Sequence, residues 1–239
     1  MSLPPYITRL LASPWGTALW CVSLDVALSD SDSAMLDAAE QARAARFRFE
    51  RDARRYRVSH VALRQMLAHA MGEPDPARIT FTQQAHGKPV LAHSAWHFNL
   101  SHSGDRALIG ISASHPIGVD LEEARPLPDG PDLAEQHFSE AEYAAYLAAP
   151  ADQREATFLR CWTRKEACLK ATGSGLVVAA RGVDVGVHSG VQGLTVADTG
   201  GRDAPGGTRL CQVEVMSLPA CAAMDGAYAA LARVQGLKP

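Results

Sequence analysis

Alternating apolar and polar side chains predict strands and helices in the first half of the chain. Residues 18–26 alternate as in a strand, and residues 37–71 have a helical spacing that ends at Gly72. A helix over this whole stretch would be long for a globular protein, so we expect a break near residues 47–52. Further short strands are predicted at residues 79–83 and 90–91.

The middle of the chain combines two strand patterns with a polar cluster. Residues 107–111 (ALIGI) are continuously apolar, as in a strand buried on both faces, and residues 117–122 (IGVDLE) alternate. Because successive side chains of a strand point to opposite faces, Asp120 and Glu122 share one face. The polar residues 99–104 (NLSHSG) precede the first of these strands and are candidates to face a ligand.

The second half of the chain repeats this order of elements. Helical spacing is followed by strand patterns and by a glycine-rich turn at residues 199–208. The repetition predicts an α+β fold of two similar lobes, each a small and mostly antiparallel sheet packed with helices, over residues 1–115 and 116–239. The helices are expected at residues 133–138, 140–147 and 153–172, and the strands at residues 183–187, 194–197, 210–216 and 227–234.

Composition excludes several classes of protein. Of the 239 residues, 47% are hydrophobic and 21% are charged, which is ordinary for a globular protein. A net charge of −3 gives no general attraction to nucleic acid or to an anionic membrane. Five cysteines without a C-x-x-C pair argue against a disulfide framework and a zinc ribbon, and no apolar run is long enough to span a membrane. We therefore expect a soluble, unprocessed protein of the reducing cytoplasm.

Asp120 and Glu122 are the first candidates for a metal site. Their Cα atoms lie about 6.6 Å apart on a strand, and on a partly buried face such carboxylates repel unless a cation lies between them. Glu166, on the last predicted helix, and Lys170, one turn later, complete a set that suits an oxygen-binding ion such as Mg²⁺. Two simpler explanations stay open: a solvated strand face, and a Glu166–Lys170 ion pair on the helix surface.

A local excess of arginine suggests a phosphate-bearing ligand or a nucleic-acid strand. Residues 37–64 contain eight arginines against four acidic residues, although most of them are expected on a solvated helix face. Arg55 is the one that we select as a ligand. Lys88 is a second candidate, because the chain has 19 arginines but only four lysines, and three of these lie in the segments singled out here.

Other catalytic motifs are missing from the sequence. Ser101 and His102 invite a comparison with serine hydrolases, but adjacent strand residues point to opposite faces and no G-x-S-x-G is present. The chain also lacks H-E-x-x-H, G-x-G-x-x-G and G-x-x-x-x-G-K-[ST].

Four segments, taken in order, resemble the motifs of the 4′-phosphopantetheinyl transferases. The resemblance covers residues 40–190 and is to the surfactin-synthetase-type class, whose members are two-lobed monomers. It implies that a phosphopantetheine arm passes from coenzyme A to a serine of an apo acyl or peptidyl carrier protein, with Mg²⁺ bound and 3′,5′-ADP released. The segments are Gly87-Lys88-Pro89, residues 98–103 (FNLSHS), residues 118–122 (GVDLE) and residues 162–170 (WTRKEACLK).

The resemblance also implies roles for single residues. Asp120, Glu122 and Glu166 would hold Mg²⁺, and Glu166 would also act as the base for the carrier serine. Lys170 and His102 would bind the diphosphate and stabilise the departing ADP.

At the nucleotide end, Lys88, Ser101 and Arg55 would contact the nucleotide and its 3′-phosphate. Lysines that some members place before the first basic helix have no match here, which leaves the 3′-phosphate contacts open. The alternative is a non-catalytic protein that binds coenzyme A or RNA through the region Arg43–Arg64.

Overall fold

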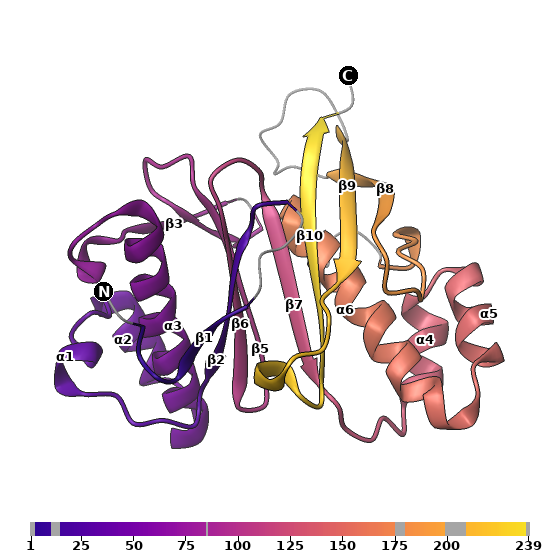
Figure 1. Ribbon diagram of the computed structural model, residues 1–239, viewed down its shortest axis with the longest axis horizontal. Coiled ribbons are helices and arrows are strands. Elements are labelled where there is room, and N and C mark those ends of the chain that lie inside the picture. Colours follow the sequence, from indigo (N-terminus) through magenta and orange to yellow (C-terminus); the bar gives the residue numbers. More distant parts are fainter. Residues whose placement is uncertain (1–2, 11–14, 85, 175–179, 199–208, 238–239) are drawn as a thin grey trace.

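Two antiparallel four-stranded sheets lie side by side within the residues described by this computed structural model, which are 3–10, 15–84, 86–174, 180–198 and 209–237. Helices flank the two sheets on their outer sides (Figure 1). The predicted α+β fold of two similar lobes is confirmed. The turn expected at residues 199–208 lies outside the described residues.

The first sheet has the strand order β1-β2-β6-β5, and β3 and β4 form a separate two-stranded sheet. Their bounds are β1 Ile7–Arg9, β2 Ala18–Ser23, β3 Phe81–Gln83, β4 Pro89–Leu91, β5 His97–Ser103 and β6 Arg106–Ser112. The helices of this lobe are α1 Asp30–Ser33, α2 Ala38–Ala44 and α3 Glu50–Met71, with a 3-10 turn η1 at Pro76–Arg78.

The second sheet has the strand order β7-β10-β9-β8. Its strands are β7 Ile117–Glu123, β8 Gln192–Asp198, β9 Arg209–Ser217 and β10 Ala227–Leu237. The helices are α4 Gly130–His137, α5 Glu140–Ala148 and α6 Arg154–Thr172, and the 3-10 turns are η2 Ala151–Gln153, η4 Ala180–Gly182 and η5 Ala222–Met224. In both lobes the last strand (β6 or β10) lies between the strand that precedes it in sequence (β5 or β9) and an earlier strand (β2 or β7).

The break predicted in the long helical stretch is confirmed. Asp37 caps the N-terminus of α2 together with Glu40, and the chain leaves the helix at Ala45 before α3 begins at Glu50. Helix α3 ends at Gly72, whose φ of 71° is a left-handed conformation that glycine adopts without strain. The buried face of α3 covers the first sheet, and the side chains between them form the core of the first lobe.

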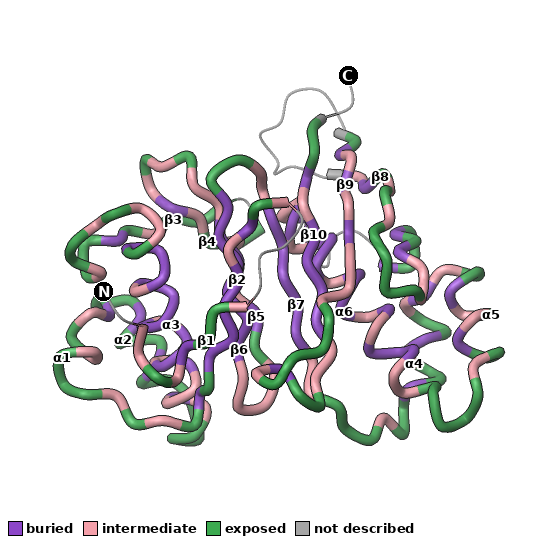
Figure 2. Tube along the Cα trace, in the orientation of Figure 1, coloured by how far each residue is buried: buried purple, intermediate pink, exposed green. Residues whose placement is uncertain are grey.

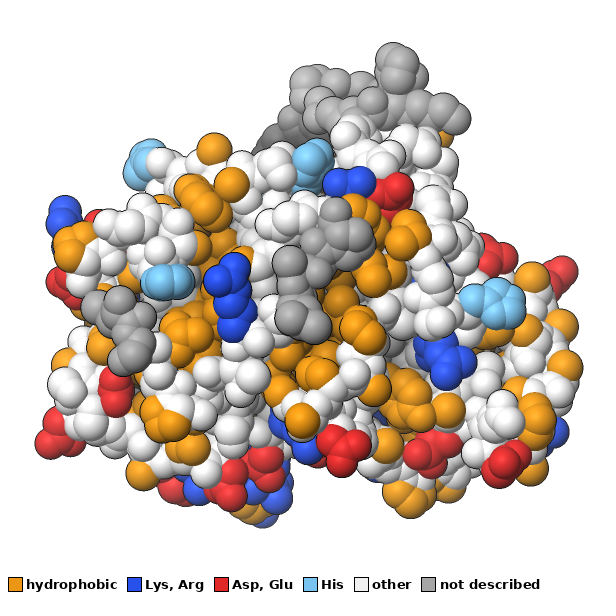
Figure 3. Space-filling view, viewed as in Figure 1, with side chains coloured by type: hydrophobic (Ala, Val, Ile, Leu, Met, Phe, Trp, Pro, Cys, Tyr) orange, Lys and Arg blue, Asp and Glu red, His pale blue; other side chains and the backbone are white. Residues whose placement is uncertain are grey.

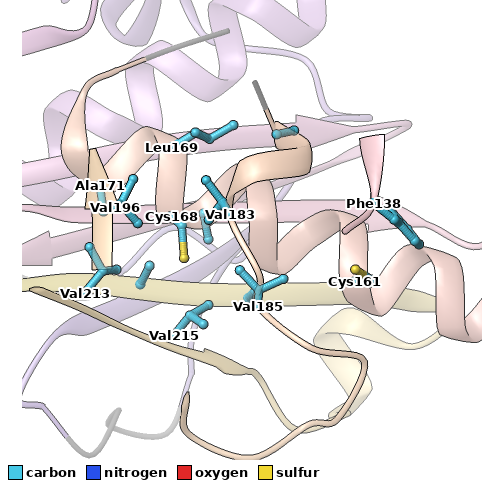
Figure 4. Packing of buried hydrophobic residues seen from close by; sticks show 14 of the residues in the cluster. Phe138, Cys161, Cys168, Leu169, Ala171, Val183, Val185, Val196, Val213 and Val215 are labelled. Atoms are coloured by element: carbon cyan, nitrogen blue, oxygen red, sulfur yellow. The ribbon is translucent and has the colours of Figure 1, made fainter. Parts of the chain in front are cut away.

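The strand predicted at residues 183–187 is wrong. The ammonium group of Lys165 donates to the carbonyl oxygens of Ala180 and Val183, and Glu142 Oε1 accepts from the backbone nitrogen of Val185 at 2.7 Å. Side chains of α5 and α6 thus form hydrogen bonds with backbone groups of this segment that, in a sheet, would pair with a neighbouring strand. Figure 4 shows Val183 and Val185 packed into the apolar core between α6 and the second sheet.

A third apolar cluster joins the two lobes. Leu19 and Leu108 of the first sheet pack against Val119 and Leu231 of the second, and all four side chains are at most 1% exposed. Figure 2 shows the central strands as the most continuously buried part of the chain. Because this core is shared, the division into residues 1–115 and 116–239 stays a prediction.

The face seen in Figure 3 carries apolar atoms over the middle of the molecule, and acidic groups lie along its lower rim. None of the helices in the described residues is long and apolar enough to cross a membrane.

Candidate active site

The side chain of Asp120 lies at the centre of a buried polar cluster between the lobes. Asp120 is 3% exposed, and its Oδ1 accepts from Lys170 Nζ at 2.6 Å and from Ser101 Oγ at 2.7 Å. Its Oδ2 is buried and has no hydrogen-bond partner among the described residues. Burial raises the pKa of Asp120, and the ammonium group of Lys170 opposes this effect.

Glu122 and Glu166 are half-buried and lie near Asp120. Burial raises the pKa of Glu122, a hydrogen bond from Ser103 lowers it, and the charge of Asp120 raises it again. Burial also raises the pKa of Glu166, with Lys170 acting against it and both Asp120 and Glu122 adding to it. Glu166 is therefore close enough to Asp120 and Glu122 for their charges to raise its pKa, although it lies 46 residues after Asp120 in the sequence.

Gly118 allows α6 to come close enough to β7 to form this site. A Cβ atom at this position would lie 2.1 Å from the carbonyl oxygen of Ala167 and 2.4 Å from the backbone nitrogen of Ala171. Gly118, Asp120 and Glu122 share one face of the strand, so the helix that rests on the glycine brings Glu166 and Lys170 to the carboxylates.

Both simpler explanations for the acidic residues are wrong for Asp120 and Lys170. Asp120 is buried rather than solvated, and Lys170 forms its ion pair with Asp120 on a strand of the same lobe. Within the described part of the chain, the carboxylate of Glu166 has no hydrogen-bond or ion-pair partner. Its carboxylate is therefore available to a ligand or a substrate.

His102 lies beside this site but points away from the row of serines. It is exposed on β5, between Ser101 and Ser103. Partial loss of hydration lowers the pKa of its ring, and the positive charges of Lys170, His60 and Arg55 lower it further. His102 thus lies near other basic groups, and its contact with phosphate stays a prediction.

Arg55 and Lys88 bind protein groups in this structure. Arg55 pairs with Asp105 at 2.8 Å and with Asp52 at 3.6 Å. Lys88 Nζ donates to the carbonyl oxygen of Ile117 and to two carbonyl oxygens at the C-terminus of α6. Burial lowers the pKa of Lys88 to about 8. Contacts of either residue with a nucleotide stay a prediction.

The carboxylates of Asp120, Glu122 and Glu166 are of the chemical type that binds a hard divalent cation, but they are not arranged as a preformed metal site. Carboxylate oxygens are the ligands that Mg²⁺ prefers. Asp120 Oδ2, which is buried and has no hydrogen-bond partner among the described residues, could serve as such a ligand. However, the described residues contain no group of three His, Cys, Asp or Glu side chains placed to hold a metal ion. The ammonium group of Lys170 balances Asp120 instead, so the side chains would have to shift to surround a cation.

Two polar residues of β5 were indicated by the sequence only as members of the cluster at residues 99–104, without contacts of their own. Asn99 Oδ1 accepts from the backbone nitrogen of Val119 at 2.7 Å, and Ser103 Oγ donates to Glu122 Oε2 at 2.8 Å. Their signal was present, because Asn99, Ser101 and Ser103 alternate with larger side chains and therefore share one face of a strand.

Comparisons with known proteins give one consistent result. A family model described as "4'-phosphopantetheinyl transferase, N-terminal" matches residues 29–115, and one described as "4'-phosphopantetheinyl transferase superfamily" matches residues 116–201. The chain is 38% identical over 179 residues to 4′-phosphopantetheinyl transferase HetI of Nostoc sp., which covers 72% of this chain and 74% of that protein.

Other relatives match over shorter stretches. The chain is 41% identical over 138 residues to 4′-phosphopantetheinyl transferase psf-1 of Bacillus pumilus, covering 57% of this chain and 58% of that protein. It is 33% identical over 144 residues to 4′-phosphopantetheinyl transferase Sfp of Bacillus subtilis, covering 60% and 62%. Among solved structures, the match to holo-[acyl-carrier-protein] synthase of Thermotoga maritima covers 50% of this chain and 62% of that chain, with a TM-score of 0.30 and 20% identity.

Proposed function

The chain belongs to the 4′-phosphopantetheinyl transferase superfamily, and from this premise we propose that the cluster of Asp120, Glu122, Glu166 and Lys170 is its active site. As an enzyme, it is a 4′-phosphopantetheinyl transferase. We propose coenzyme A as the donor and a serine of an apo acyl or peptidyl carrier protein as the acceptor. The serine oxygen forms a bond to the β-phosphorus, the diphosphate bond breaks, and 3′,5′-ADP leaves with the bonding electrons.

The carboxylates would hold the cation that this chemistry uses. Asp120, Glu122 and Glu166 supply only oxygen donors, which suits Mg²⁺. Mg²⁺ held there would neutralise charge on the diphosphate as the bond breaks. The observation that supports this assignment most directly is Asp120 Oδ2, a buried carboxylate oxygen without a hydrogen-bond partner among the described residues.

Glu166 would take the proton of the carrier serine, directly or through a water molecule. Its carboxylate accepts no hydrogen bond from the described residues, and burial raises its pKa, which makes the ionised form a stronger base than a solvated carboxylate. Lys170 Nζ, now on Asp120, and His102 would donate to the phosphate oxygens and stabilise the departing ADP.

The nucleotide end is proposed to lie against Lys88, Ser101 and Arg55. Arg55 would exchange Asp105 for a phosphate, which its planar guanidinium group binds with two parallel hydrogen bonds. Because one chain supplies the residues of the site from both lobes, we propose that the enzyme acts as a monomer, in the cytoplasm and without nucleic acid or membrane.

Intact-mass analysis of apo carrier proteins after incubation with enzyme, coenzyme A and Mg²⁺ tests this function. Glu166→Gln keeps the size of the side chain but removes the base, so we expect transfer to slow by at least about 100-fold while coenzyme A binding persists. Glu155→Gln, on the first turn of the same helix, is the control and should retain activity.

Carrier modification at an unchanged rate by Glu166→Gln would refute the role of Glu166. If the wild-type protein binds coenzyme A but adds no mass to any carrier, the non-catalytic alternative is favoured instead.

A further inference from the structure

Three polar side chains of β5 reach across the boundary between the lobes. Asn99, Ser101 and Ser103 occupy alternate positions of this edge strand and all bind β7, the edge strand of the other sheet. Asn99 binds a backbone nitrogen of β7, whereas the two serines bind carboxylates. The first lobe thus contacts the acidic side chains that the second lobe contributes to the site.

The direction of each serine hydrogen bond is fixed by a second neighbour. Ser103 Oγ accepts from the backbone nitrogen of Glu123 at 3.2 Å, and Ser101 Oγ accepts from Lys170 Nζ at 3.0 Å. A backbone N–H and an ammonium group can only donate, so each hydroxyl proton is left for a carboxylate. Ser103 donates to Glu122 Oε2 at 2.8 Å, and Ser101 donates to Asp120 Oδ1 at 2.7 Å.

Each serine hydroxyl donates to one oxygen of its carboxylate, and the other oxygen accepts no hydrogen bond from it. Asp120 Oδ2 is buried without a hydrogen-bond partner, and Glu122 Oε1 accepts no hydrogen bond from any residue in the described ranges. A carboxylate held in this way can turn only one oxygen to a ligand. Fixing the orientation of a ligating side chain from behind is the usual function of groups that surround a metal site.

We propose that Ser103 is a positioning residue of the transferase, which orients Glu122 so that Oε1 faces the bound cation. This inference rests on the proposed function, since it requires that the carboxylates hold a divalent ion. It gives Ser103 a role in the reaction without contact with substrate.

The test compares Ser103→Ala with Ser103→Thr in the full-length protein. Binding of Mn²⁺, used as the probe with saturating coenzyme A, is measured by calorimetry. Removing a group that orients a metal ligand weakens metal binding by about 10–100-fold. We expect this loss in Ser103→Ala and recovery in Ser103→Thr, which keeps the hydroxyl on a side chain suited to a strand. The Mg²⁺ concentration that gives half-maximal transfer should rise in parallel.

Asn99→Ala is the matched control for a purely structural effect. Asn99 belongs to the same row and joins the same strands, but it touches no carboxylate. We expect this variant to lower the melting temperature and to leave Mn²⁺ affinity within about threefold of wild type. Equal losses of affinity in Asn99→Ala and Ser103→Ala, or unchanged affinity in Ser103→Ala, would overturn the proposal.

The outcomes separate this inference from the proposed function. If the wild-type protein binds no Mn²⁺ in the presence of coenzyme A, the assignment of the carboxylates to a cation fails, and the role of Ser103 fails with it. If the wild-type protein binds Mn²⁺ and Ser103→Ala binds it equally well, only the positioning role is wrong.

Discussion

Arg64, a fully buried residue of α3, shows how one side chain fixes the position of a short helix. It is 0% exposed and pairs with Glu40 at 2.8 Å and with Asp37 at 2.9 Å, and it also donates to the carbonyl oxygen of Ile79 at 2.7 Å. Burial alone would raise the pKa of Glu40, but hydrogen bonds from His60 and Arg64 outweigh it and lower the pKa. The result is a carboxylate that favours the folded state only when it is ionised.

Replacing Glu40 with glutamine should reveal this pH dependence. A carboxylate with a lowered pKa stabilises the fold above its unfolded-state pKa, and the stabilisation is lost as the pH falls through the folded-state value. We expect Glu40→Gln to lower the free energy of unfolding by about 1.5–3 kcal/mol at pH 7, and the difference from wild type to shrink below about pH 4.5. Urea unfolding at several pH values measures both.

Glu73→Gln is the matched control, since Glu73 pairs with the exposed Arg78 at 3.5 Å and should contribute less than about 1 kcal/mol. A pH-independent loss in Glu40→Gln would show that Glu40 acts through packing rather than through its charge.

Among the contacts between elements, α6 and β7 approach each other so closely at Gly118 that an added methyl group would clash with the helix backbone. Gly118 lies against the backbone of the helix, and no side chain can move aside to admit a methyl group there. We expect Gly118→Ala to lower the free energy of unfolding by about 1–3 kcal/mol or more and to slow transfer, because α6 shifts together with Glu166 and Lys170.

Thermal unfolding and carrier modification measure these effects. Gly193→Ala, in β8, is the control, because nothing lies within 4 Å of its added Cβ and both quantities should stay near the wild-type values. Unchanged activity in Gly118→Ala would mean that the close approach does not position the site.

Local patterns predicted those elements that depend on local interactions. The break between α2 and α3, the glycine ends of α3 and α6, and the alternation in β7 follow from residues near one another in sequence. The strand predicted at residues 183–187 was wrong because the partners of this segment, Glu142 and Lys165, are distant in sequence. The alternation of side chains within the segment carries no information about them.

The candidate site was predictable to a similar extent. Period-two spacing in β7 and four-residue spacing in α6 indicated which acidic residues share a face, but not that Lys170 pairs with Asp120 rather than Glu166. That pairing depends on how closely the helix approaches the strand, which is a property of the tertiary fold.

For the molecule as a whole, the shared cluster of Leu19, Leu108, Val119 and Leu231 makes the lobes depend on each other. We expect residues 116–239 expressed alone to expose the half of this cluster that β7 and β10 contribute. Such a fragment should bind a hydrophobic dye and melt below the full-length chain. A fragment that melts cooperatively at the full-length temperature, without binding dye, would establish residues 116–239 as an independent domain.

The row of β5 side chains has a second consequence, for association between copies of the chain. Strand β7 ends its sheet, and an uncovered outer edge would invite a strand from another molecule to extend the sheet. Instead, Asn99 and Ser103 bind the amide nitrogens of Val119 and Glu123. The same row of side chains that reaches the carboxylates thereby also closes this edge to intermolecular pairing.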